Sequence, residues 1–202
     1  MGCRNASPRT HGDEGAVSAF VPGTEPIPGD RMFKEQWALQ NNGQAFYCPT
    51  ADIIAWDADG LLPAQVEEFG TAGAVVVLAH EIGHAVHTRL GIGADRGSAR
   101  YPPILLEAMA DCFAGVALAH LIDFPGPGLP LDLVERDQAL LALVGFRDPV
   151  GVDSRDEGAH GNAFDRVSAF QSGARLLTLP LPPPIGPWCH AEIRLARPRE
   201  HP

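Results

Sequence analysis

Basic runs and long apolar runs are both scarce in this chain. Its 15 Lys and Arg residues stand against 25 Asp and Glu, which gives a formal net charge of −10. Nucleic acids and anionic membranes attract basic surfaces, so this balance argues against both as general partners. No segment approaches the roughly 18 uninterrupted apolar residues that a membrane helix needs. The sequence therefore predicts no membrane span and no nucleic-acid partner, and it leaves the oligomeric state open.

Closely spaced cysteines are also lacking. Cys3, Cys48, Cys112 and Cys189 are widely separated and form no CxxC pair, which argues against a zinc ribbon or a dithiol redox motif. Four thiols allow three complete pairings, and the sequence does not choose among them. Within "ADCFAG", we expect Cys112 to pack as a small hydrophobic residue.

The chain has the length and the apolar content of one catalytic domain. Its 202 residues are 45% hydrophobic, enough for a single core. The start has neither the cationic front nor the apolar stretch of an export signal. Composition divides the chain into three parts, with the ranges 1–30, 31–178 and 179–202. The first is a Gly- and Pro-rich arm that is loosely ordered or lies over the surface, and the second is the catalytic domain. The third is a proline-rich tail that lies on the surface or is disordered.

Hydrophobic periodicity and turn residues predict a mainly helical α+β fold. "AFYCPTADIIAWD", residues 45–57, is typical of two short strands joined by a turn. Proline and glycine positions then delimit four helices, at about 63–90, 104–121, 131–144 and 161–177.

The first predicted helix carries three polar residues in an otherwise apolar stretch, "AHEIGHAVH". His80 and His84 are four residues apart, so both imidazoles leave the same helix face and can reach one tetrahedral zinc ion. Glu81 lies beside them and can take a proton from metal-bound water without itself being a ligand. The alternative is that both histidines are hydrogen-bonded core residues without a metal.

The second predicted helix repeats the pattern with two acids. "ILLEAMAD" places Glu107 and Asp111 four apart among leucine, alanine and methionine. Catalytic zinc takes three protein ligands, so Glu107 is the candidate for the third if the two helices pack antiparallel. Asp111, one turn along, can then accept a hydrogen bond from the free ring nitrogen of a zinc-binding histidine. The alternative is a solvated acidic face, which the flanking apolar residues argue against.

Three linked segments, "VVVLAHEIGHAVHTRLG", "LLEAMADCFAG" and "GAHGNAFDRVSAFQSG", resemble the neutral zinc metallopeptidase family of bacteria. With "AFYCPTADIIAWD", the resemblance covers about residues 40–175. It implies a compact zincin-like fold in which His80 and His84 bind zinc, Glu81 is the base and Glu107 is the third ligand. Members of the family usually carry an export signal or a membrane anchor, which this chain's N-terminal stretch does not resemble.

Two further histidines attract attention. His160, in the glycine-flanked "GAHGN" segment, could donate to the oxyanion that forms on a substrate carbonyl, or it could be a loop or helix-cap residue. His87 shares the face of His84 one turn on. A third ligand from that helix would lie too far along the axis, so we expect His87 to pack behind the ligands.

The sequence as a whole thus predicts a zinc-dependent peptidase that acts on peptides or proteins. Two alternatives stay open. One is a non-catalytic or degenerate protein stabilised by zinc, although such a site has no use for a carboxylate at Glu81 that does not ligate. The other is an amide hydrolase that acts on cell-wall peptide, which the sequence does not distinguish from a peptidase.

Overall fold

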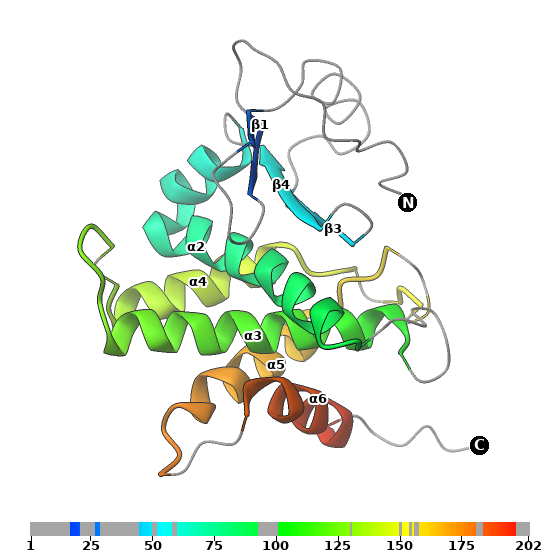
Figure 1. Ribbon diagram of the computed structural model, residues 1–202. Helices are drawn as coiled ribbons and strands as arrows, with labels where there is room; N and C mark the ends of the chain where they lie inside the picture. Colours follow the sequence, from blue (N-terminus) through cyan, green and yellow to red (C-terminus); the bar gives the residue numbers. More distant parts are fainter. Residues whose placement is uncertain are drawn as a thin grey trace.

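The mainly helical α+β class predicted from the sequence is confirmed by the computed structural model (Figure 1). It describes residues 17–20, 27–28, 45–49, 52–57, 60–92, 101–129, 131–149, 151–153, 155, 158–180 and 184–196. The strands are β1 (Val17–Phe20), β2 (Ile27–Pro28), β3 (Ala45–Cys48) and β4 (Ile53–Asp57). The helices are α2 (Leu61–Arg89), α3 (Pro103–Asp123), α4 (Leu133–Gly145), α5 (Ala163–Leu176) and α6 (Ile185–Ala196).

The four strands form one antiparallel sheet in the order β2-β1-β4-β3. The predicted hairpin over residues 45–57 is present, and Cys48 pairs with Ile53 beside the turn. Residues 17–20 and 27–28 lie in the arm expected to be loosely ordered or to lie over the surface, and they form β1 and β2. The other residues of the 1–30 arm lie outside the described part of the chain.

Four of the helices begin and end within about three residues of their predicted bounds. Helix α2 tolerates Pro63 because a proline in the first turn removes only an N–H that has no partner within the helix. Gly91, just beyond its end, has a φ of 71°, the left-handed conformation expected of a glycine after a helix. The feature not predicted is a break at Gly70, whose φ of 69° interrupts the helical backbone.

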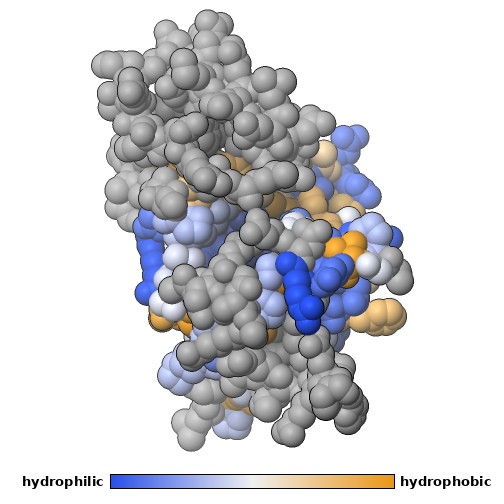
Figure 2. All heavy atoms as spheres, turned by 90° about the vertical axis from the view of Figure 1, so that its right-hand side faces the viewer, coloured by the Kyte–Doolittle hydropathy of each residue, from blue (hydrophilic) through white to orange (hydrophobic). Residues whose placement is uncertain are grey.

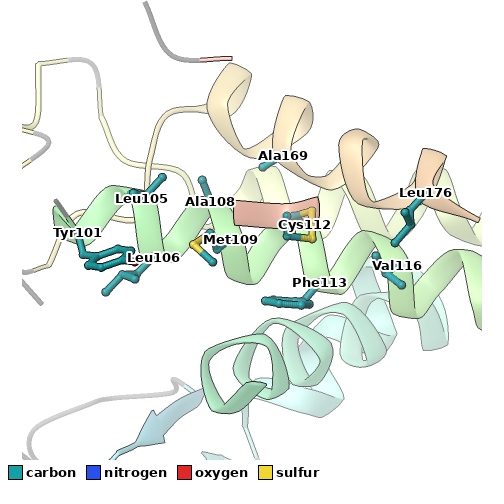
Figure 3. Close-up of a cluster of buried hydrophobic side chains, with 11 residues drawn as sticks. Tyr101, Leu105, Leu106, Ala108, Met109, Cys112, Phe113, Val116, Ala169 and Leu176 are labelled. Carbon is teal, nitrogen blue, oxygen red and sulfur yellow. A yellow bond between two sulfur atoms is a disulfide. The ribbon is translucent and has the colours of Figure 1, made fainter. Parts of the chain in front are cut away.

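Helix α3 is the centre of the fold. In Figure 1 it runs between α2 and α4 on one side and α5 and α6 on the other, and it contacts all four. Most of its residues are buried, including every one from Pro103 to Val116, which explains why its sequence shows no polar face. Figure 3 shows Phe113 on the side of α2 and Ala108 on the side of α5.

Glycines allow α3 to approach its neighbours at backbone distance. A Cβ atom placed on Gly83 of α2 would lie 2.8 Å from both Cα and O of Ala110. Where α3 crosses α5, a Cβ on Gly115 would clash with the carbonyl oxygen of Phe170, and one on Gly173 with that of Cys112. Side chains at these three glycines would force the helices apart. The short separation brings polar groups of α2 and α5 within reach of α3.

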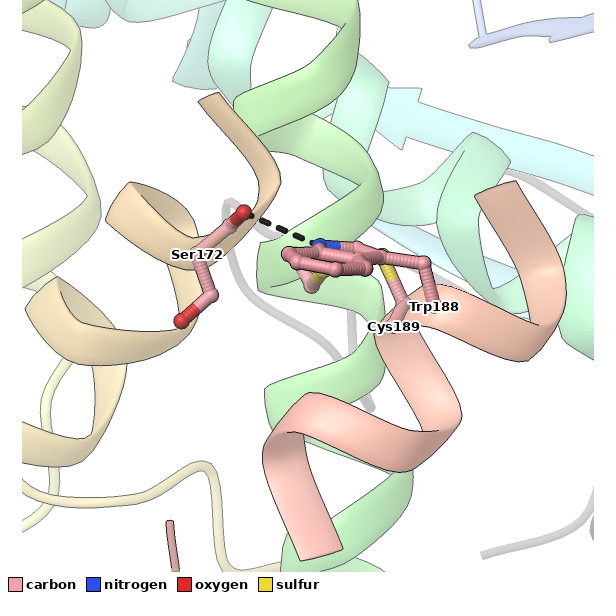
Figure 4. The surroundings of a disulfide bond; sticks show 4 residues. Ser172, Trp188 and Cys189 are labelled. Atoms are coloured by element: carbon pink, nitrogen blue, oxygen red, sulfur yellow. Dashed lines mark hydrogen bonds between the residues drawn. A yellow bond between two sulfur atoms is a disulfide. The ribbon is translucent and has the colours of Figure 1, made fainter. Parts of the chain in front are cut away.

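The C-terminal region differs from the sequence expectation. Residues 179–202 are predicted as a tail on the surface or disordered, yet α6 forms within them and packs against α3 and α5. Cys189 is fully buried and forms a disulfide with Cys112. Cys112 is thus a buried half-cystine rather than a small hydrophobic residue with a free thiol. Figure 4 shows Trp188 beside this disulfide, where its indole N–H donates to the Ser172 carbonyl at 3.1 Å.

By length and composition alone, α2 and α3 could each cross a membrane. The core helix of a soluble protein passes the same test, and 78% of the most apolar window of α3 is buried inside the fold. The absence of a membrane span stays a prediction.

Candidate metal centre

His80 and His84 occupy successive turns in the second half of α2, where the helix faces α3. Both are buried, with 6% and 8% of their surface exposed. Their Nε2 atoms face each other at 3.0 Å. The four-residue spacing has the effect predicted from the sequence, because both imidazoles converge on one point.

Glu107 reaches the same point from α3. Its Oε2 lies 3.2 Å from Nε2 of His80, and its Oε1 lies 3.4 Å from Nε2 of His84. The contact of Gly83 with the Ala110 backbone, less than one turn from Glu107, sets this short helix separation. The predicted convergence of the three side chains is therefore observed, and together they could hold a metal ion.

The spacing of the donor atoms fits a small divalent cation. Zinc ligands lie about 2.0–2.1 Å from the ion, so two ligands of a regular tetrahedron are about 3.3–3.4 Å apart. The two Nε2 atoms are 3.0 Å apart, and each of them lies 3.2 or 3.4 Å from a different oxygen of the Glu107 carboxylate. Two imidazoles and one carboxylate match the donors of catalytic zinc sites. The donor types and their separations therefore suit a small divalent metal ion.

The second ring nitrogen of each histidine has a partner of its own. Nδ1 of His80 donates to Oδ1 of Asp111 at 2.7 Å, and Asp111 is fully buried. Nδ1 of His84 lies 3.0 Å from Nε2 of His87. These contacts leave Nε2 of each histidine as the nitrogen that can bind a metal. The predicted placements of Asp111 and His87 behind the ligands agree with this geometry.

The cluster shifts the pKa values of His80 and Glu107 in opposite directions. Burial alone would lower the pKa of His80, but the charge and hydrogen bond of Asp111, with the hydrogen bond of Glu107, raise it to about 10. Burial alone would raise the pKa of Glu107, but His84 and His80 hold it well below its usual range. Without a metal, a proton on His80 therefore balances part of the negative charge, and a cation that binds there must displace it.

Glu81, the predicted base, lies in the turn of α2 between the two histidines. It is buried, and its charge contributes to the raised pKa of His80. It does not belong to the group of three ligand atoms that lie within 4.8 Å of one another. The structure thus places a buried carboxylate close enough to act on the charge of His80 and outside the group of candidate ligands.

His160, the candidate oxyanion donor, lies on the segment that precedes α5. Its side chain is half exposed, and its Nδ1 is 3.8 Å from Oδ1 of Asp148. A Cβ placed on the next residue, Gly161, would lie 3.7 Å from Cδ1 of Ile104. The segment therefore runs past the first turn of α3, about one turn before Glu107. His160 is not part of the three-residue ligand group, and its catalytic role stays a prediction.

Arg166 is the member of the cluster that sequence analysis missed. From α5, its guanidinium donates to Oδ1 of Asp111 at 2.8 Å, and it is 2% exposed. The sequence does contain a signal for this residue. Arg166 lies on the same buried face of α5 as Ala169, Phe170 and Gly173. An arginine at such a position needs a buried partner. Its partner is 55 residues away, so the sequence alone did not identify it.

A second polar group links the hairpin to the end of α2. The Tyr47 hydroxyl donates to Oδ1 of Asp52 at 2.9 Å, and Arg89 donates to Oδ2 of Asp52 at 2.6 Å. Burial and the Asp52 carboxylate raise the pKa of Tyr47 to about 12, so the hydroxyl stays a donor at neutral pH. These bonds fix β3 relative to the helix that carries both histidines.

The surface at this end of the molecule is mixed in character. Figure 2 views the side of Figure 1 where α2 ends and α3 begins. Hydrophilic side chains and smaller hydrophobic patches are interspersed among the described residues on that face.

Comparison of the chain with protein-family models, curated proteins and solved structures finds no match.

Proposed function

We propose that this protein is a zinc-dependent metallopeptidase with a compact zincin-like fold. The observation that carries the proposal is the buried Glu81 beside, but outside, the group of His80, His84 and Glu107. A site that served only to stabilise the fold would gain nothing from a further buried carboxylate, whose burial is costly. A general base needs that position, next to the metal and free of it.

In the proposed reaction, each residue of the cluster has a distinct role. A zinc ion bound by His80, His84 and Glu107 supplies a Lewis acid and makes water acidic near pH 7. The Glu81 carboxylate accepts a proton from the attacking water and delivers it to the nitrogen of the leaving amine. Asp111 and His87 hold the two imidazoles so that Nε2 faces the ion. His160 is the candidate donor to the oxyanion.

Glu81→Gln tests this proposal most directly. The amide is close in size to the carboxylate and leaves the three ligands untouched, so the zinc content should stay near one ion per chain. Positioned general bases contribute about 10²–10⁴ in rate, so hydrolysis should fall by at least about 10². The measurements are metal analysis by mass spectrometry and cleavage of a fluorogenic peptide mixture. Glu68→Gln, at an exposed position on the same helix, is the matched control and should change neither.

Comparison of Glu81→Gln with His84→Ala distinguishes the loss of chemistry from the loss of metal binding. Two protein ligands rarely hold zinc, so this change should abolish both the metal content and the hydrolysis. If Glu81→Gln instead strips the metal, then Glu81 is a ligand and the proposed role is wrong. A wild-type protein that holds zinc but cleaves no peptide would favour a stabilising metal. Cleavage of cell-wall peptides alone would favour the amide-hydrolase alternative.

A further inference from the structure

Arg166 is held at both ends of its guanidinium fork. One terminal nitrogen donates to Oδ1 of Asp111 at 2.8 Å, and the other donates to the Phe146 carbonyl, just beyond α4, at 3.1 Å. The side chain is 3% exposed. A planar guanidinium with two fixed contacts has little freedom to turn. It therefore presents one nitrogen to Asp111 in a defined direction.

The carboxylate of Asp111 depends on that nitrogen for its orientation. Its Oδ1 accepts from both His80 and Arg166, whereas its Oδ2 has no hydrogen-bond partner among the described residues. A guanidinium has only donors, so it cannot compete with the carboxylate for the His80 proton. Arg166 thus fixes the acceptor that keeps Nδ1 of His80 protonated and leaves Nε2 for a metal.

Arg166 also sets the formal charge of the buried cluster. Within the described part of the chain, the buried acidic and basic side chains are Glu81, Glu107, Asp111 and Arg166, besides the histidines. Three carboxylates and one guanidinium have a formal net charge of −2, which one divalent cation neutralises. Buried charge is stable only when it is balanced. Removal of Arg166 would leave one negative charge unbalanced after the metal binds.

We propose that Arg166 is a positioning residue of the metal centre, which acts on the His80 ligand through Asp111 and matches the site to a divalent ion. This inference rests on the zinc site of the proposed function but not on its peptidase activity. Loss of a hydrogen-bond partner behind a metal ligand typically costs about 10- to 100-fold in metal affinity. The same range is expected here, although Arg166 contacts the His80 ligand only through Asp111.

The test measures zinc affinity by competition with a chromophoric chelator. Arg166→Met, which keeps an unbranched apolar stem but removes the charge and the donors, should bind zinc about 10- to 100-fold more weakly. Arg175→Met, at an exposed site on the same helix, is the matched control and should stay within about twofold. The visible spectrum of the Co²⁺-loaded protein should change in Arg166→Met and not in the control. An unchanged affinity and spectrum in folded Arg166→Met would overturn the proposal.

A second set of variants, built on Asp111→Ala, distinguishes positioning of His80 through Asp111 from general support of the fold. If Arg166 acts through Asp111, then Asp111→Ala and Asp111→Ala/Arg166→Met should bind zinc equally within about threefold. A further tenfold loss in the double variant would show that Arg166 acts by another route, and the proposal would be wrong. Should Arg166→Met give no soluble protein, Arg166→Lys decides. A lysine keeps the charge but lacks the planar fork whose two terminal nitrogens donate to Asp111 and Phe146, so a loss of threefold or more supports the proposal and an unchanged affinity and spectrum overturns it.

The outcomes also separate this inference from the proposed function. Zinc binding by the wild type without peptide cleavage would count against the peptidase and leave the role of Arg166 intact. A wild-type protein that binds no zinc would overturn both.

Discussion

Helix α3 is attached to its neighbours in two different ways on its two sides. Towards α2, buried polar side chains meet, with Glu107 and Asp111 facing the histidines. Towards α6, the attachment is a disulfide from Cys112, surrounded by apolar residues. Asp111 and Cys112 are adjacent in sequence, so a single turn of α3 carries both the contact to α2 and the disulfide to α6.

The two sides differ in what they demand of their residues. On the polar side, each buried charge needs a partner at hydrogen-bond distance, and loss of one partner leaves another charge unbalanced. On the disulfide side, α6 is held against α3 by a covalent bond and by non-directional apolar contacts. We therefore expect that stability can be lowered on the disulfide side of α3 without loss of metal binding, whereas a change on the polar side affects both.

The largest expected effect comes from removal of the disulfide by Cys112→Ala/Cys189→Ala. The bond joins residues 77 apart, and a native disulfide over such a loop stabilises a fold by about 2–5 kcal/mol. The free energy of unfolding, measured with urea, should fall by that amount. Zinc affinity should stay within a few-fold, because the ligands lie on α2 and α3. A parallel loss of zinc affinity would mean that the two sides are not separable.

Gly83→Ala breaks the polar side and should have the next largest effect. The new Cβ would lie 2.8 Å from the Ala110 backbone, and such overpacking costs about 1–3 kcal/mol. Because the clash pushes α2 away from α3, zinc affinity should fall together with stability. Gly145→Ala is the matched control, since a Cβ there meets nothing within 4 Å. Unchanged zinc affinity in Gly83→Ala would show that the ligands converge without this close contact.

A further expected effect is a pH dependence that belongs to the polar side alone. In the metal-free protein, the pKa of His80 is raised from 6.5 to about 10. The folded state thus holds this proton more tightly than the unfolded state. The resulting stability is complete below about pH 6.5 and is lost as the pH rises towards 10. For Glu107, whose pKa is lowered from 4.5, the contribution is present above about pH 4.5 and is lost as the pH falls.

Urea unfolding between pH 6 and about 10, with and without zinc, checks this expectation. In the zinc-loaded protein the ion takes the place of the His80 proton, so the loss of stability towards pH 10 should shrink. The decrease in the free energy of unfolding with rising pH should persist in Cys112→Ala/Cys189→Ala, which leaves the polar side intact. An equal pH dependence of the free energy of unfolding with and without zinc would contradict its assignment to His80.

Much of the fold and the three candidate ligands could be predicted because their signals are local. The period of apolar residues and the positions of proline and glycine located four helices. The spacing of His80 and His84 is a property of one helix, and Glu107 is conspicuous on an apolar one. Antiparallel packing of neighbouring helices then brought the three side chains together. Helices that follow one another in the chain usually lie side by side, so little long-range information was needed.

The remaining features depend on contacts between distant segments. Helix α6 was missed because its prolines indicate a tail. Pro187, however, lies in the first turn, where a helix needs no donor from its N–H. The partners of Cys112 and Arg166 lie 77 and 55 residues away. Such pairings follow from the packing of α5 and α6 on α3 and not from any local pattern.

The disulfide also determines how the chain would respond to a protease. Cys112 and Cys189 enclose all of α4 and α5 in one covalent loop. A single cut anywhere within that loop leaves the two fragments bonded through sulfur. On a gel without reductant the cleaved protein would run as one 21.5 kDa species, and only reduction would separate its pieces. A cut chain would therefore keep Arg166 tethered to the helix that carries Asp111.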